Sequence, residues 1–89
     1  MRYPYCTINC YDDTEVAHSE LHSDNTVIVY FETPDEKCCF KVLTVELPSY
    51  KVLESKGYST FEVDRLMRFC VANAANIIRY ATVGGWDNA

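Results

Sequence analysis

Residues 59–82, STFEVDRLMRFCVANAANIIRYAT, decide the fold. The first four, Ser59 to Glu62, match a capping box, in which the serine hydroxyl and the glutamate carboxylate each accept a hydrogen bond from a free backbone N–H at a helix start. Apolar residues then recur at steps of three and four: Val63, Leu66, Met67, Cys70, Val71, Ala74, Ile77, Ile78 and Ala81. The pattern predicts one long amphipathic helix from about residue 60 to 82, ended by Gly84 and Gly85.

Upstream of this helix, four segments have strand patterns: 3–11, 14–22, 26–32 and 37–47. Residues 26–32 are continuously apolar and β-branched, which is typical of a central strand covered on both faces. Residues 14–22 contain few large apolar side chains, so we expect an edge strand there. Turns are expected at residues 12–13, 23–25 and 33–36, and residues 48–58 are expected to form a connector with at most one helical turn.

The apolar face of the helix must be covered, and the sheet is the only large surface in a chain of 89 residues. The sequence therefore predicts a single α+β domain over residues 1–89. Its expected architecture is a four-stranded antiparallel β-meander with one long C-terminal α-helix packed on one face. The other face of the sheet is expected to be uncovered.

Composition places this domain among folded proteins, because 48% of its residues are hydrophobic. We expect a cytoplasmic protein with no membrane contact, since the sequence has no apolar run of about 18 residues and no apolar signal core. In a reducing compartment the cysteines are expected to be free thiols buried as small hydrophobes: Cys6, Cys10, Cys38, Cys39 and Cys70.

Motifs for catalysis are absent from the sequence. The three glycines, Gly57, Gly84 and Gly85, form no phosphate loop, and no local signature pairs a cysteine or serine with a base. Cys6 and Cys10, like His18 and His22, would lie about 13 Å apart along an extended strand, too far for one metal ion. We expect no enzyme activity and no cofactor, although a composite metal site such as Cys10 with a histidine stays open.

Charge is distributed unevenly along the chain. Between residues 12 and 36 lie eight acids and no Lys or Arg: Asp12, Asp13, Glu15, Glu20, Asp24, Glu32, Asp35 and Glu36. We expect the meander to gather these acids around the second strand. A dense negative face attracts basic surfaces and repels nucleic acid phosphates. It can also be a solvated edge that is charged against aggregation, and the sequence leaves both interpretations open.

Tyrosines form the second predicted surface feature. Tyr3, Tyr5 and Tyr11 alternate with Cys6, Ile8 and Cys10, so we expect them on the uncovered side of the sheet with Tyr30. Such a patch would suit an interface, unless the connector 48–58 or the tail with Trp86 covers it. On the helix, Phe69 and Tyr80 lie off the main apolar face and indicate a second contact surface or a dimer.

These features favour a non-enzymatic binding protein that inhibits or regulates a larger basic partner, such as a nucleic-acid-binding complex, without binding nucleic acid itself. In size, acidity and lack of a catalytic motif the chain resembles phage-encoded anti-defence inhibitors, anti-CRISPR proteins among them. The alternatives are a homodimer that sequesters or senses a small ligand on the tyrosine face, and a thiol or metal protein. The expected partner-binding residues are Asp12, Asp13, Glu15, Glu20, Asp24, Tyr3, Tyr5 and Tyr11.

Overall fold

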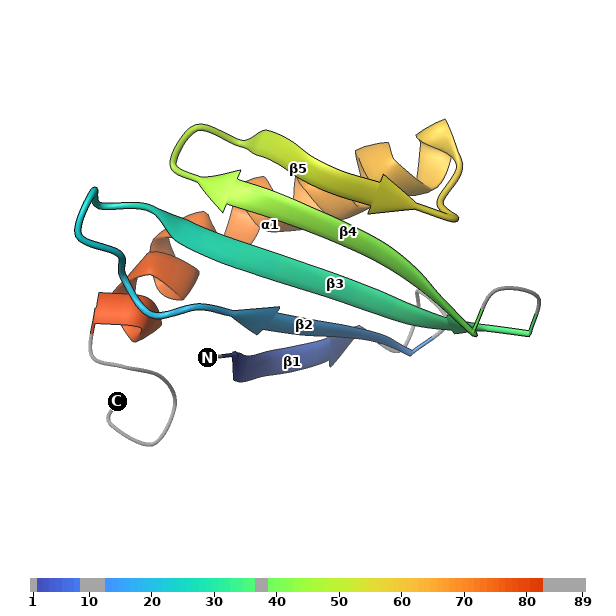
Figure 1. The fold of residues 1–89 in the computed structure, drawn as a ribbon, viewed down its shortest axis with the longest axis horizontal. Helices are drawn as coiled ribbons and strands as arrows, with labels where there is room; N and C mark the ends of the chain where they lie inside the picture. The colour runs from blue at the N-terminus through green and yellow to red at the C-terminus, as the bar shows by residue number, and fades with distance from the viewer. Residues whose placement is uncertain (1, 9–12, 37–38, 83–89) are drawn as a thin grey trace.

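The computed structural model describes residues 2–8, 13–36 and 39–82. These residues form five strands and one helix (Figure 1): β1 (Tyr3–Ile8), β2 (Thr14–His18), β3 (Val27–Asp35), β4 (Cys39–Leu47), β5 (Lys51–Lys56) and α1 (Thr60–Thr82). The α+β class, the antiparallel sheet and the single C-terminal helix are confirmed. The expected count of four strands is wrong.

The sheet is a meander in which every strand pairs antiparallel with its neighbours in sequence, in the order β1-β2-β3-β4-β5. Strand β2 therefore lies between β1 and β3, and the prediction of an edge strand at this position is wrong. The edges are β1 and β5. Strand β3 is central as expected, but it continues through Thr33, Pro34 and Asp35, where the sequence favoured a turn.

The helix runs behind the sheet in Figure 1 and covers one face of it. On β2 and β3 alternate residues point toward this helix and are buried, while the residues between them are exposed or half-exposed on the other face. The expectation that β3 is covered on both faces is therefore wrong. The hydrophobic core consists of Ile8, Val16, Val27, Val29, Phe31, Leu43, Val45 and Leu47 from the sheet and Leu66, Cys70, Ala74, Ile77 and Ala81 from the helix.

The helix begins where the capping box predicted. The Glu62 backbone N–H donates to Ser59 Oγ over 3.2 Å, and the Ser59 backbone N–H donates to Glu62 Oε1 over 2.9 Å. At the far end, the backbone N–H of Leu21 donates to the carbonyl of Ala81 over 3.3 Å, which ties the helix terminus to the β2–β3 connection. Within the described residues, no helix is both long and apolar enough to cross a bilayer.

The fifth strand lies in the segment expected to be a connector. All six residues of β5 are exposed, so the segment lacks the alternation of buried and exposed side chains that marks a strand in sequence. Its pairing with β4 is also irregular between Thr44 and Val45, which breaks the period of two. An exposed edge strand of this kind has no hydrophobic signature.

Candidate functional site

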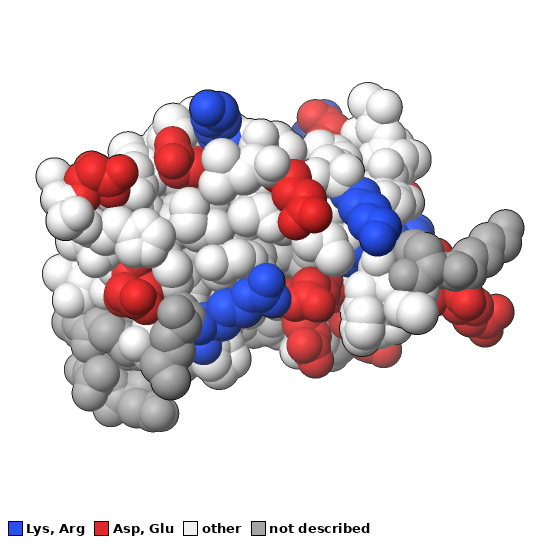
Figure 2. Space-filling view, in the orientation of Figure 1, with Lys and Arg blue, Asp and Glu red and all other residues white. Residues whose placement is uncertain are grey.

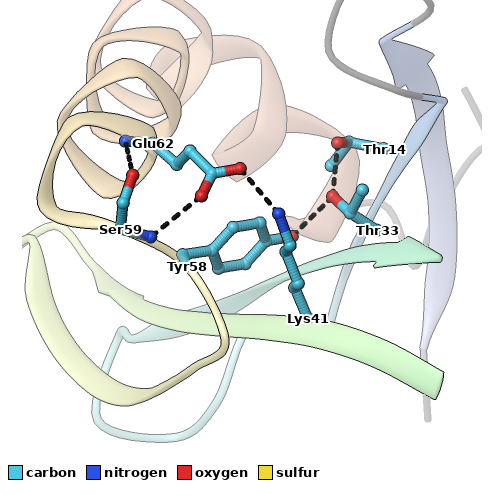
Figure 3. A network of polar contacts seen from close by, with 6 residues as sticks. All are labelled: Thr14, Thr33, Lys41, Tyr58, Ser59 and Glu62. Carbon is cyan, nitrogen blue, oxygen red and sulfur yellow. Dashed lines mark hydrogen bonds and ion pairs between the residues drawn. The ribbon is translucent and has the colours of Figure 1, made fainter. Parts of the chain in front are cut away.

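A row of hydrogen-bonded hydroxyl groups connects β2, β3 and the segment that precedes α1 (Figure 3). Thr14 on β2 and Thr33 on β3 lie opposite each other, with their Oγ1 atoms 2.6 Å apart, and Thr33 Oγ1 lies 2.7 Å from the hydroxyl of Tyr58. Both threonines are buried. Burial also raises the pKa of the Tyr58 hydroxyl above its usual value, so this group stays protonated and can donate a hydrogen bond.

An ion pair lies beside this row of hydroxyl groups. Lys41 on β4 donates to Glu62 Oε2 over 2.9 Å, and its ammonium group lies 5.9 Å from the centre of the Tyr58 ring (Figure 3). The hydrogen bond from the Ser59 backbone N–H, followed by that from Lys41, lowers the pKa of Glu62. Glu62 therefore serves two purposes, because it caps the helix and ties the helix start to the sheet. We interpret this network as structural, because its hydrogen bonds and ion pair hold the start of the helix against the sheet.

Substitutions at Glu62 separate these two contributions. Glu62→Gln keeps an acceptor for the Ser59 N–H but removes the ion pair, and we expect it to lower the free energy of unfolding by about 0.5 to 1 kcal/mol. Glu62→Ala removes both interactions and should cost about 1 to 2 kcal/mol. Urea denaturation at neutral pH measures both. No loss for Glu62→Gln would show that the ion pair with Lys41 contributes nothing, whereas equal losses for the two variants would show that the hydrogen bond from the Ser59 N–H contributes nothing.

The pH dependence gives an independent check of the Glu62 interactions. Because the folded state lowers the pKa of Glu62, its stabilising effect is present above the unfolded-state pKa of about 4.3 and is lost as pH falls through the lower folded-state value. The stability difference between the native protein and Glu62→Gln should therefore shrink in acid.

The acidic residues do not gather on one face. Asp13 precedes β2, and Asp35 ends β3 and Glu36 follows it at the same end of the sheet, because Thr14 and Thr33 are hydrogen-bonded there. Glu20 and Asp24 lie in the β2–β3 connection, at the opposite end of β3. The nine residues of β3 separate the two groups by about 26 Å. The expectation of one acidic surface around the second strand is wrong, and Asp12 lies outside the described residues.

The uncovered face of the sheet has charges of both signs, as Figure 2 shows. Glu15 on β2 lies directly opposite Glu32 on β3, an unfavourable arrangement of like charges. Arg2 offsets it, because its Nη1 lies 2.6 Å from Glu32 Oε1 and its guanidinium carbon lies 4.0 Å from the centre of the Tyr30 ring. This face is therefore partly neutralised.

Tyr3 and Tyr5 point toward the helix, not toward the uncovered face. The Tyr3 ring lies 5.8 Å from the ring of buried His18, and the Tyr5 hydroxyl donates to Asn73 Oδ1 over 2.9 Å. Burial raises the pKa of Tyr5. The pairing of β1 with β2 is irregular between Pro4 and Cys6, which places an extra residue in β1 and shifts the side chains to other faces.

The aromatic side chains Phe69 and Tyr80 of the helix are half-buried and pack against Tyr5 of β1. The Phe69 ring lies 6.4 Å from Tyr5 and 6.2 Å from Phe31, and Tyr80 lies 6.0 Å from Tyr5. Phe69 and Tyr80 therefore belong to a half-buried aromatic cluster with Tyr5, and the expected second contact surface there stays a prediction. The predicted tyrosine patch loses Tyr3 and Tyr5, while Tyr11 and Trp86 lie outside the described residues.

The thiols and imidazoles of the described residues form no cluster of three. Cys70 is buried as expected, and burial raises its pKa to about 11, but Cys6 and Cys39 are exposed, contrary to expectation. Cys10 and Cys38 lie outside the described residues. His18 is fully buried and donates from Nδ1 to the Ser19 carbonyl over 2.8 Å. In the part of the chain that the structure describes, no three His, Cys, Asp or Glu residues could hold a metal ion together.

Two features escaped the sequence prediction. Asp35 and Glu36 were not among the expected binding residues, although their place at the β3–β4 hairpin sets them beside Asp13. Strand β5 was not expected at all. Comparison of the chain with protein-family models, with curated proteins and with solved structures gives no match.

Proposed function

We propose that this chain is a small non-enzymatic binding protein that docks on a basic surface of a larger partner. The contact lies at the end of the sheet where β2 begins and β3 ends. A nucleic-acid-binding protein is a suitable partner, because the lysine and arginine residues with which it neutralises phosphates form a basic surface. Occupying such a surface would inhibit the partner.

The observation that supports this proposal is the unbalanced charge at this end. Asp13, Glu15 and Glu36 are exposed and make no ion pair with any described residue. The basic residues nearest to them along the sheet, Arg2 and Lys41, are already paired with Glu32 and Glu62. We define Asp13, Glu15, Asp35 and Glu36 as the acidic end.

The net charge of the acidic end stays negative when Lys37, the neighbouring base in sequence, is included. Lys37 follows Glu36 in sequence and lies outside the described residues, and four acids against this one base leave a net charge of −3. Glu20 and Asp24 are excluded from the proposed contact because they lie at the opposite end of β3. A group of acids at one end of the sheet steers a basic partner toward that end during encounter.

Association kinetics test the proposal, with the partner first isolated on the native protein at low ionic strength. The variant neutralises three exposed acids at once: Asp13→Asn, Glu15→Gln and Glu36→Gln. We expect its association rate to fall by about tenfold or more at low salt, and added salt should slow the native protein in the same way.

A matched control separates position from net charge. It neutralises three acids outside the acidic end: Asp24→Asn, Glu46→Gln and Asp64→Asn. In Asp24→Asn the amide oxygen can retain the hydrogen bonds that Asp24 Oδ1 accepts from Thr26. This control should associate nearly as fast as the native protein. If both triple variants slow equally, only net charge matters, and if neither slows, the acidic end is not the contact.

A further inference from the structure

A hollow of about 240 Å³ lies between β1 and β2, the strands at the lower edge of the sheet in Figure 1. Pro4 is paired with Ala17 and Thr7 with Glu15, and the side chains of paired residues share one face of an antiparallel ladder. That face is the uncovered one, because Glu15 is paired on its other side with Glu32 of β3. The hollow therefore opens on the face of the sheet that the helix does not cover.

The irregular pairing of β1 widens this hollow. Two residues, Tyr5 and Cys6, separate Pro4 from Thr7, where a regular strand has one residue between neighbours on the same face. The extra residue spreads the Pro4 and Thr7 side chains apart. Tyr5 and Val16 also line the hollow, and because their side chains pack toward the helix, their backbone forms its floor.

A negative charge without a counter-ion stands beside the hollow. Among the described residues that line it, only Glu15 is charged, because burial raises the pKa of the Cys6 thiol and keeps that group neutral. Glu15 makes no ion pair with any described residue. It lies opposite Glu32, whose carboxylate is already paired with Arg2 over 2.6 Å. Two carboxylates thus share one guanidinium, and one positive charge is lacking at Glu15.

We propose that the hollow receives an arginine side chain of the basic partner and pairs it with Glu15. This inference rests on the proposed function, because Glu15 belongs to the acidic end, and it names the group of the partner that binds there. A second guanidinium gives each of the two opposed carboxylates its own cation. The like-charge pair of Glu15 and Glu32, unfavourable in the free protein, becomes favourable in the complex.

The size and the walls of the hollow suit this occupant. Pockets for small-molecule ligands usually enclose about 300 to 1,000 Å³, so a hollow of about 240 Å³ fits one side chain better. The methylene stem of an arginine can pack on Pro4 and Ala17. A guanidinium is planar, is weakly hydrated and donates two parallel hydrogen bonds to one carboxylate, whereas an ammonium group does not.

Binding of a short arginine peptide tests the hollow without the partner. The probe is acetyl-Gly-Arg-Gly-amide, added up to about 20 mM while the backbone amide shifts of the protein are followed by NMR; a contact of this size should have a Kd of about 1 to 10 mM. The shifts should saturate and concentrate at Thr7, Glu15 and Ala17. The matched lysine peptide, acetyl-Gly-Lys-Gly-amide, should bind at least about threefold more weakly.

Two variants with matched controls locate the binding. Ala17→Leu fills the hollow without changing the net charge and should weaken binding of the arginine peptide at least about fivefold, whereas Ala75→Leu, at an exposed position of the helix, should not. Glu15→Gln should weaken binding to a similar extent, whereas Glu54→Gln, at an exposed position of β5, should bind like the native protein. Circular dichroism establishes that each variant is folded.

The inference is overturned if the native protein shows no saturable binding, if the lysine peptide binds equally well, or if a folded Ala17→Leu binds like the native protein. Should Ala17→Leu not fold, equal binding by Glu15→Gln and Glu54→Gln overturns it instead.

The proposed acidic contact is judged by a different measurement. A variant with Asp13→Asn and Glu36→Gln keeps Glu15, and its association rate with the isolated partner should still fall at low salt. Ala17→Leu should leave this rate unchanged and speed dissociation at least about tenfold, because a contact that fills a hollow acts after encounter. A negative result with the peptide leaves the association rates as they are, so the two proposals fail independently.

Discussion

Replacing Phe31 by Ala is expected to lower the free energy of unfolding by about 3 to 5 kcal/mol. Phe31 lies at the middle of the central strand β3, its side chain is fully buried, and its ring packs edge-on against Phe69 of the helix at 6.2 Å. Truncation removes buried apolar area and leaves a cavity between sheet and helix, which neighbouring side chains fill only in part.

The control for Phe31→Ala is the same substitution at Phe61, whose side chain is 71% exposed on the first turn of the helix. Phe61→Ala should change the free energy of unfolding by less than about 0.5 kcal/mol. Urea denaturation of both variants gives the comparison, and the slope of the transition should be unchanged. Similar losses for the two variants would contradict the burial of Phe31.

The parts of the fold that bury one regular face were predictable from sequence. The helix from Thr60 to Thr82 follows from the capping box and from apolar residues at steps of three and four. Strands β3 and β4 follow from β-branched and alternating residues. For the helix and β4 one physical cause, burial of a periodic face, acts on both the sequence and the structure, whereas β3 was predicted from its β-branched residues and its expected cover on both faces is wrong.

The parts that depend on irregular pairing were not predictable. The extra residue in β1 between Pro4 and Cys6 turns Tyr5 toward the helix, and Pro4, which is typical of an edge strand or a bulge, does not by itself give the position of the extra residue. Strand β5 is held by backbone hydrogen bonds to β4 and buries none of its side chains fully. A strand that depends on its neighbour in this way leaves no hydrophobic period to detect.

The sequence predicted the negative charge of the candidate surface, but it did not predict which acidic residues lie together. The count of acids between residues 12 and 36 is a property of sequence, whereas their grouping depends on the length of β3. A nine-residue strand carries Glu20 and Asp24 to one end and Asp35 and Glu36 to the other. Charge along a chain therefore indicates a surface only after the turns are placed.

Replacing Ile77 by Ala is expected to lower the free energy of unfolding by about 2 to 5 kcal/mol, although alanine is the better helix former. Ile77 is fully buried on the face of α1 that packs against the sheet. The matched control is Val71→Ala on the same helix, because Val71 is 58% exposed and its replacement changes helix propensity with little loss of packing.

The two substitutions should have opposite signs. Val71→Ala should raise the free energy of unfolding by about half a kcal/mol or less through propensity, whereas the cavity at Ile77 outweighs the same gain several times. Chemical denaturation of both variants, with circular dichroism to follow the helix, measures the difference. A loss below half a kcal/mol at Ile77 would mean that this face of the helix is not docked on the sheet, because a cavity forms only where the side chain fills space between two packed layers.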